Sequence, residues 1–186
     1  PMSDINIYEV GPRDGLQNSN FNVTTHEKIT MIEELYNANL KNIEITSFVH
    51  PKLVPNMADA KEVFTATKDL ADFSVLVPNQ KGFDRATEVG AKKMNVFFSP
   101  SDSFNQANLG KSLQGAISEI NMMLHNTDKE NVRAYVSCAF GCPIEGKPSE
   151  YKLLEAMQVA DEFADTVVLC DTIGVAHPTQ MLRTLE

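Results

Sequence analysis

Short apolar runs, rich in β-branched residues, recur along the chain, and each stops at a turn signal or a polar residue. The first, INIYEV, places Ile5, Ile7 and Val10 directly ahead of a Gly-Pro break. This is the pattern of a strand followed by a turn. Five further runs of the same kind occupy residues 42–46, 73–77, 94–98, 131–136 and 166–170. The pattern therefore predicts six short β-strands.

Amphipathic segments fill most of the intervals between these runs. The first begins with a capping-box pattern, Thr24 followed by Glu27, ahead of apolar residues at helical spacing. Ser149 follows a proline and is an N-cap candidate for the last of them. The pattern predicts helices over residues 24–35, 112–124 and 149–163.

Strands that alternate with helices predict a parallel sheet with right-handed crossovers. Two architectures compete, a doubly wound open sheet and a (β/α)₈ barrel of the TIM type. The loop after the first run, VGPRDGLQN, lacks the G-x-G-x-x-G spacing of a dinucleotide fold. Polar residues recur where the strands end, which is where barrel enzymes build their sites. The sequence therefore predicts an α/β, (β/α)₈ TIM-barrel type fold.

The length limits how much of such a barrel the chain can form. A complete (β/α)₈ barrel takes about 250 residues, whereas this chain has 186. We therefore expect about six of the eight units, in a single partial catalytic domain over residues 1–186 that lacks the C-terminal units.

Composition restricts the partners. The formal net charge of −9 disfavours a nucleic-acid surface and binding to anionic membranes, although a small anionic ligand needs only local positive charge. Apolar runs stay well short of the roughly 18–20 residues of a membrane helix. The first strand begins within a few residues of Pro1, so we expect no signal peptide.

The cysteines indicate a reducing compartment, because their number, three, is odd and their spacing is not that of a disulfide framework. We expect a cytoplasmic protein of bacterial type, with the mitochondrial matrix left open. Cys138 and Cys142 lie four residues apart. Without a second pair this spacing favours two reduced thiols over a zinc site.

Ionisable and polar residues mark the ends of the predicted strands. In NIEIT, Glu44 faces away from its two isoleucine neighbours. An inward carboxylate needs a partner, and Arg13, one strand away, is the obvious candidate. Asp14 and Asp171 have a plainer alternative role, which is to cap the turns that follow them. Three carboxylates and one arginine on one rim favour a site over this alternative: Asp14, Glu44, Asp171 and Arg13. Asn79 and Ser137 also follow predicted strands.

Five blocks resemble hydroxymethylglutaryl-CoA lyase, and together they span almost the whole chain. They are GPRDGLQN, IEITSFVHPKLVPNMADA, LVPNQKGFDRA, YVSCAFGCPIEGK and DTIGVAHP. The resemblance implies a (β/α)₈ barrel that uses a divalent cation, Mg²⁺ or Mn²⁺. It also implies cleavage of an acyl-CoA substrate, 3-hydroxy-3-methylglutaryl-CoA, to acetyl-CoA and acetoacetate, and a homo-oligomer in the full-length protein.

The resemblance also assigns roles to residues of this chain. It implies that Asp14 is a metal ligand and that Arg13, Glu44 and Asp171 are catalytic. It also implies that Arg13 binds the substrate, and we expect Gln17, Asn79 and Ser137 to bind it as well. The family's other metal ligands, a His-x-His pair and an asparagine, and its late catalytic cysteine have no counterpart in this sequence.

Two alternatives stay open on the sequence alone. One is a related barrel aldolase or Claisen-type synthase that acts on 2-oxo acids. The other is a chain that is not catalytic as it stands, because the remaining metal ligands are absent from it.

Overall fold

The computed structural model describes residues 5–185, and the chain divides into two compact units, residues 1–94 and 95–186. Each unit is described by itself. The single domain expected over residues 1–186 stays a prediction. Among the described helices, none has both the length and the apolarity to cross a lipid bilayer.

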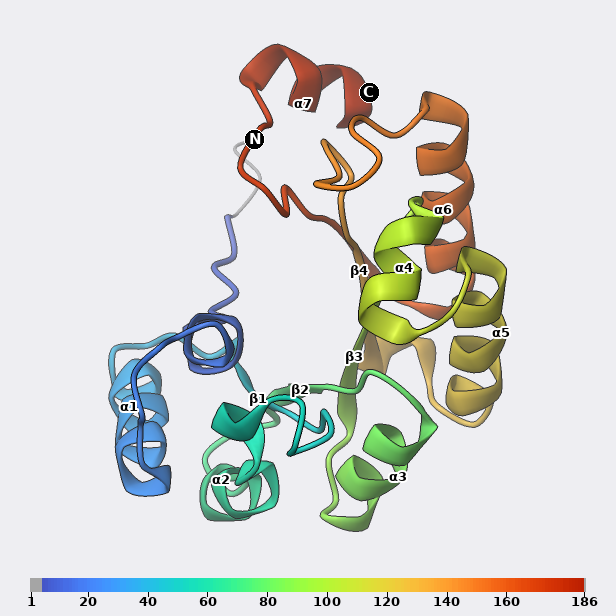
Figure 1. The fold of residues 1–186 in the computed structure, drawn as a ribbon. Helices are drawn as coiled ribbons and strands as arrows, with labels where there is room; N and C mark the ends of the chain where they lie inside the picture. The colour runs from blue at the N-terminus through green and yellow to red at the C-terminus, as the bar shows by residue number, and fades with distance from the viewer. Residues whose placement is uncertain (1–4, 186) are drawn as a thin grey trace. The chain divides into compact units, whose positions relative to one another are not determined.

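Five of the six predicted strands are present (Figure 1). β1 pairs with β2 in the first unit and β4 pairs with β5 in the second, in both cases in parallel. The strand order follows the chain, β1-β2-β3-β4-β5. The strands are β1 Glu44–Ser47, β2 Ser74–Leu76, β3 Lys93–Phe98, β4 Val132–Val136 and β5 Thr166–Leu169.

The first predicted strand is wrong in extent. Within residues 5–10, one isolated parallel bridge joins Glu9 to Ile43, and the side chains of Ile5 and Ile7 are 90% and 63% exposed. Strand propensity reflects how well a side chain packs on a half-buried pleated surface. Ile5 and Ile7 lack that burial, so the β-branched pattern does not extend the pairing beyond one bridge.

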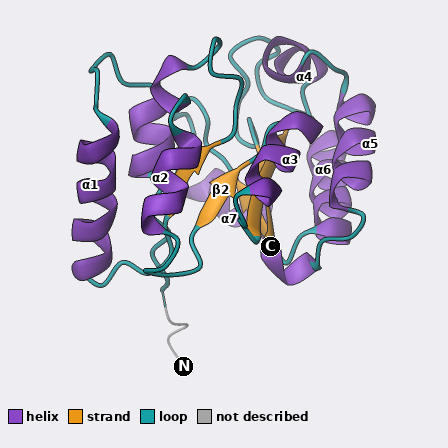
Figure 2. Cartoon of the chain, turned by 90° about the horizontal axis from the view of Figure 1, so that it is seen from below, coloured by secondary structure: helices purple, strands orange, loops and turns teal. Residues whose placement is uncertain are grey.

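Helices occupy most of the intervals between the strands, in the alternation that the sequence predicts (Figure 2). They are η1 Gly11–Gly15, α1 Thr25–Asn37, η2 Pro55–Met57, α2 Ala60–Thr67, α3 Gln80–Glu88, α4 Asp102–Leu109, α5 Leu113–Leu124, η3 Lys129–Asn131, α6 Glu150–Phe163 and α7 Pro178–Leu185. The capping box of Thr24 and Glu27 is confirmed, and so is Ser149, whose side chain accepts from the backbone N–H of Lys152. These caps satisfy N–H groups that a helix start otherwise leaves unpaired.

The first unit packs α1 beside α2, and α2 against β1. All four residues of β1 are buried. In the second unit, α6 packs on β4 and β5 and contacts α5. Its core includes Val96, Phe98 and Val136. In each unit helices pack on the strands, and the carboxyl ends of such strands are the natural places for accessible polar groups.

Gly82 permits a close approach between α3 and the loop after β1. A Cβ atom at this position would lie 2.6 Å from the Phe48 carbonyl oxygen and 2.9 Å from Cδ of Pro78. The Arg85 guanidinium lies 5.6 Å from the Phe48 ring centroid and donates to the carbonyl oxygen of Val49 at 3.3 Å. The start of α3 is therefore fixed at the backbone of residues 48 and 49.

We expect Gly82→Ala to lower the free energy of unfolding by about 1–3 kcal/mol, because the added methyl group must displace backbone. Urea titration of the purified protein measures the change. Gly115→Ala in α5 is the control. Its Cβ would meet nothing closer than 3.4 Å, so it should be neutral or add about 0.5–1 kcal/mol. Wild-type stability for Gly82→Ala would contradict the prediction.

Candidate active site

A single π-helical turn, η1, carries Arg13 and Asp14. The backbone N–H groups of both residues donate to the carbonyl oxygen of Val10, at 3.1 and 2.6 Å, and Pro12 is buried beneath the turn. The Gly11 N–H donates to Glu9 Oε1 at 2.6 Å. Single π-helical turns are rare and are frequent at functional sites. This one turns the chain sharply just beyond the bridge at Glu9.

The guanidinium of Arg13 lies between two carboxylates of different exposure. Its Nε donates to Oε1 of Glu44, whose side chain is fully buried. Its Nη1 donates to Oδ1 of Asp14 at 2.8 Å, and the Asp14 side chain is 54% exposed. The predicted pairing of Glu44 with Arg13 is therefore present. The catalytic roles of the two residues stay predictions.

The turn fits a divalent cation in part. Asp14 offers an exposed carboxylate, the oxygen ligand that Mg²⁺ and Mn²⁺ prefer. Among residues 5–185, however, the structure shows no group of three or more His, Cys, Asp or Glu side chains that could hold a metal ion. Asp14 therefore suits one position in such a site.

Gln17 follows the turn, and its Oε1 atom is buried without a hydrogen bond to any of residues 5–185. The hydroxyl of Ser47, at the carboxyl end of β1, is in the same situation. An unpaired buried polar atom carries a penalty of about 1–3 kcal/mol. Ser47 was missed by the sequence reasoning, although its place at a strand end is the signal that singled out the other candidates.

Asn79 has a local role in the structure. It is the N-cap of α3, and its Oδ1 accepts from the backbone N–H of Gly82 at 3.0 Å. The substrate-binding role expected of Asn79 stays a prediction, and the capping contact leaves its amide nitrogen as the group for a ligand.

Ser137 and Asp171 belong to the second unit. Ser137 directly follows β4, and its backbone N–H donates to the carbonyl oxygen of Phe98 at 2.8 Å. Asp171 follows β5, and its two carboxylate oxygens accept from the backbone N–H groups of Val175 and Ala176, at 2.9 and 3.0 Å. Asp171 therefore caps its own loop, as the plainer alternative predicted. Whether it also acts in catalysis stays a prediction, as does substrate binding by Ser137.

The loop after β4 holds two buried, reduced thiols, as expected for Cys138 and Cys142. Cys138 takes a left-handed backbone conformation, with φ of 59°, and its N–H donates to Thr172 Oγ1 at 2.8 Å. Burial raises the pKa of the Cys138 thiol to about 11. It therefore stays protonated where an exposed thiol would ionise.

The pKa of Cys142 is shifted in the opposite direction. Burial works against ionisation, yet the Ser101 hydroxyl and the backbone N–H groups of Glu145 and Ile144 outweigh it and lower the pKa of Cys142. Its sulfur lies 3.2 Å from Ser101 Oγ and 3.4 Å from each of the two nitrogens. The pKa values of the two thiols in this loop are therefore shifted in opposite directions.

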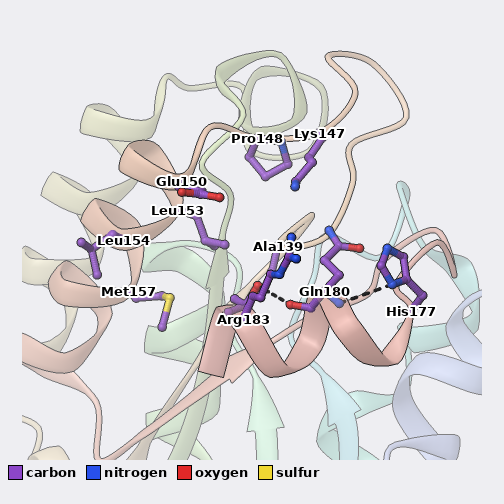
Figure 3. A pocket seen from close by; sticks show the side chains of 11 residues that line it. Ala139, Lys147, Pro148, Glu150, Leu153, Leu154, Met157, His177, Gln180 and Arg183 are labelled. Carbon is purple, nitrogen blue, oxygen red and sulfur yellow. Dashed lines mark hydrogen bonds between the residues drawn. The ribbon is translucent and has the colours of Figure 1, made fainter. Parts of the chain in front are cut away.

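A cavity of about 340 Å³ opens in the second unit between the start of α6 and α7 (Figure 3). Apolar side chains of α6, among them Leu153 and Met157, line one side. Three basic side chains, Lys147, His177 and Arg183, and the carboxylate of Glu150 also line it. An apolar wall with basic groups suits a ligand that carries both a hydrophobic part and negative charge.

Comparison with known proteins shows that the chain is similar to hydroxymethylglutaryl-CoA lyases. The family model described as HMGL-like matches residues 4–186. The chain is 42% identical over 182 residues to the mitochondrial hydroxymethylglutaryl-CoA lyase of Homo sapiens. The aligned region covers 94% of this chain and 55% of that protein.

Solved structures agree with this relationship. The HMG-CoA lyase of Bacillus subtilis matches with a TM-score of 0.90 and 37% identity, over 97% of this chain and 62% of that one. The HMG-CoA lyase of Acinetobacter baumannii, solved with coenzyme A and 3-methylmalate, matches with a TM-score of 0.89 and 33% identity, over 97% of this chain and 60% of that one. These likenesses confirm the predicted (β/α)₈-type fold. The chain spans 55–62% of the length of these three relatives.

The raised pKa of Cys138 makes a testable contribution to stability. The pKa of the Cys138 thiol has its ordinary value of 9.0 in the unfolded chain and is raised to about 11 in the folded chain. The folded state holds the proton more tightly, so this contribution is complete below pH 9 and is lost as pH rises toward 11. We expect Cys138→Ala to reduce the loss of stability across that interval, measured by urea unfolding at both ends of it.

Cys142→Ala is the matched control, because it removes a thiol whose pKa is shifted the other way. It should steepen the loss of stability or leave it unchanged. Equal pH dependence of the wild type and Cys138→Ala would show that Cys138 does not ionise differently on folding.

Proposed function

The chain belongs to the HMGL-like family, and from that premise we propose that the protein carrying it cleaves 3-hydroxy-3-methylglutaryl-CoA to acetyl-CoA and acetoacetate. One observation supports this most directly. Arg13, in the GPRDGLQN block, is held between the buried carboxylate of Glu44 and the exposed carboxylate of Asp14. A fixed cation beside an exposed carboxylate suits a reaction that removes a hydroxyl proton and develops an enolate.

The reaction defines what these residues must do. A base takes the proton of the tertiary hydroxyl, the adjacent carbon–carbon bond breaks, and the electron pair moves to the thioester carbonyl as an enolate. A proton returned to the enolate carbon yields acetyl-CoA, and the former alcohol becomes the ketone of acetoacetate. Arg13 is charged at every working pH, so we propose that it stabilises the enolate oxygen. Glu44 orients the guanidinium by holding its Nε.

Asp14 is proposed as the metal ligand that this chain contributes. A divalent cation bound there, Mg²⁺ or Mn²⁺, supplies Lewis-acid chemistry that acidifies the substrate hydroxyl and orients the substrate. The carboxylate of Asp14 also accepts a hydrogen bond from Arg13. The same carboxylate would therefore hold both the cation and the guanidinium.

Asp171 is proposed to relay or accept the hydroxyl proton. Gln17, Asn79 and Ser137 are proposed to bind the substrate. For Gln17, the buried and unpaired Oε1 atom supports this role. We further propose that the full-length protein acts on an acyl-CoA substrate and is a homo-oligomer. Its proposed location is the cytoplasm or the mitochondrial matrix.

An assay of the full-length protein tests the function. With Mg²⁺ or Mn²⁺ present, 3-hydroxy-3-methylglutaryl-CoA should disappear with equal formation of acetyl-CoA and acetoacetate. Turnover of a 2-oxo acid in an aldol or Claisen-type reaction, with 3-hydroxy-3-methylglutaryl-CoA left intact, would replace the proposal with the related barrel chemistry. No turnover of either class would leave a non-catalytic protein.

Arg13→Lys should lower turnover by about 10²-fold or more while the protein stays folded. Lysine keeps the charge, but its single ammonium cannot reproduce the planar fork that meets Glu44 and Asp14. Turnover and the melting temperature are measured together. Arg85→Lys, in α3 of the same unit, is the matched control and should keep wild-type turnover.

A structural role for Arg13 predicts the opposite result. If Arg13 serves chiefly to neutralise Glu44, then Arg13→Lys should melt early and retain full activity per folded molecule. That combination would remove Arg13 from the catalytic machinery.

Substitutions of the two aspartates should have different effects on metal affinity. Asp14→Asn removes a charged oxygen ligand, so calorimetric titration of the full-length protein with Mn²⁺ should show weaker binding, and added metal should restore part of the activity. Asp171→Asn should lower turnover with nearly unchanged Mn²⁺ affinity. If Asp171→Asn loses the metal and Asp14→Asn keeps it, the two assignments are reversed.

A further inference from the structure

Lys28 is a charged residue on the buried face of α1. It is 6% exposed, and its ammonium group makes three contacts with the segment that opens α2. Nζ lies 2.7 and 2.9 Å from the two carboxylate oxygens of Asp59 and 2.5 Å from the backbone carbonyl oxygen of Asn56. Thr25 adds a hydrogen bond from its hydroxyl to Oδ2 of Asp59 at 2.8 Å.

Stability alone is a weak reason for this arrangement. A buried ion pair is frequently no more stabilising than apolar side chains of similar volume, because both charges lose their hydration. An apolar residue at position 28 would continue the buried face that Ile32 forms one turn later. The lysine instead fixes the orientation of the groups that it contacts. Its ammonium fixes a carboxylate and the carbonyl group of Asn56 at once.

Asn56 passes this constraint to the chain that follows the π-helical turn. Its amide nitrogen donates to the carbonyl oxygen of Leu16 at 3.0 Å and to that of Ser19 at 2.9 Å. Gln17 and Asn18 lie between these two residues in the chain. Both amide hydrogens of Asn56 are therefore used to clamp one short segment.

The clamped segment is joined directly to the catalytic candidates. Inside it, Ser19 N–H donates to Leu16 O at 3.2 Å, and Asn18 N–H reaches Asp14 O at 3.3 Å. Both contacts are longer than those made by Asn56. The side-chain amide of Asn18 also donates to Asp14 O, at 3.0 Å. The amide of Asn56 adds to these local contacts two hydrogen bonds from a distant part of the chain, of 3.0 and 2.9 Å.

We propose that Asn56, supported by Lys28 and Asp59, is a positioning residue for the active site. The clamp holds residues 16–19 so that Gln17 and the turn carrying Arg13 and Asp14 keep one orientation. This inference rests on the proposed function for its kinetic readouts. Metal binding through Asp14 and amide exchange test it independently of turnover.

Asn56→Ala in the full-length protein removes both amide donors and keeps the carbonyl group that Lys28 contacts. We expect turnover to fall by about 10–10²-fold, since small displacements of catalytic groups have effects of that size. Mn²⁺ affinity should weaken several-fold, and backbone amides of residues 14–19 should exchange faster with deuterium. Asn108→Ala is the matched control, because Asn108 is exposed and its Nδ2 donates to one carbonyl oxygen, that of Phe104, at 2.9 Å.

A second variant separates positioning from folding. Lys28→Met with Asp59→Asn removes both charges together and leaves neither of them buried alone. It breaks the contact with the Asn56 carbonyl, so turnover and Mn²⁺ affinity should again fall, by less than in Asn56→Ala. This variant decides the question if Asn56→Ala does not fold.

The inference is overturned by a folded variant that melts earlier but is otherwise unchanged. Such a variant would show wild-type turnover per folded molecule, wild-type Mn²⁺ affinity and unchanged amide exchange of residues 14–19. Failure of the proposed function looks different. In that case the wild type itself does not cleave 3-hydroxy-3-methylglutaryl-CoA, and Mn²⁺ affinity and amide exchange still decide whether Asn56 acts as a clamp.

Discussion

The buried carboxylate of Glu44 is the constraint on which the candidate site depends. A fully buried charge in β1 requires a partner. Removing one member of such a pair typically lowers the free energy of unfolding by about 3–5 kcal/mol. Arg13 supplies the partner, and to do so the chain must turn immediately after Glu9, the residue that bridges to Ile43. The π-helical turn achieves this, and its sharpness brings Asp14 to the surface beside the guanidinium. One electrostatic requirement in β1 therefore sets the positions of Arg13 and Asp14, which lie 31 and 30 positions earlier in the chain.

The sequence predicts those parts of the fold that depend on local pattern. Five strands and the caps at Thr24 and Ser149 agree with the structure, because burial periodicity and capping are encoded within a few residues. The strand expected over residues 5–10 fails because its length depends on a pairing partner and on burial, which β-branched composition does not report. The partner of Glu44 was predictable, since the need to neutralise an inward carboxylate follows from alternation along the strand.

Other features of the candidate site depend on contacts between distant segments. Helical patterning treats a lysine as a solvent-facing residue, so the burial of Lys28 and its contact with Asn56 cannot be read from residues 24–35. Asn56 lies within the block IEITSFVHPKLVPNMADA, but no local pattern there predicts its contacts. Its importance arises from two carbonyl groups some 40 residues away in the chain. Asp171 shows the reverse case, since its position drew attention to chemistry while its contacts are those of a loop cap.

The hydrogen bonds of Asp171 have a further consequence for observing this residue. The amide protons of Val175 and Ala176 point at its two carboxylate oxygens, and amide nuclei respond to the charge of the group that they contact. Their chemical shifts are therefore an intrinsic spectroscopic reporter of whether Asp171 carries a proton. A pH titration followed by nuclear magnetic resonance can read that charge at two separate nuclei, without altering a single atom of the side chain.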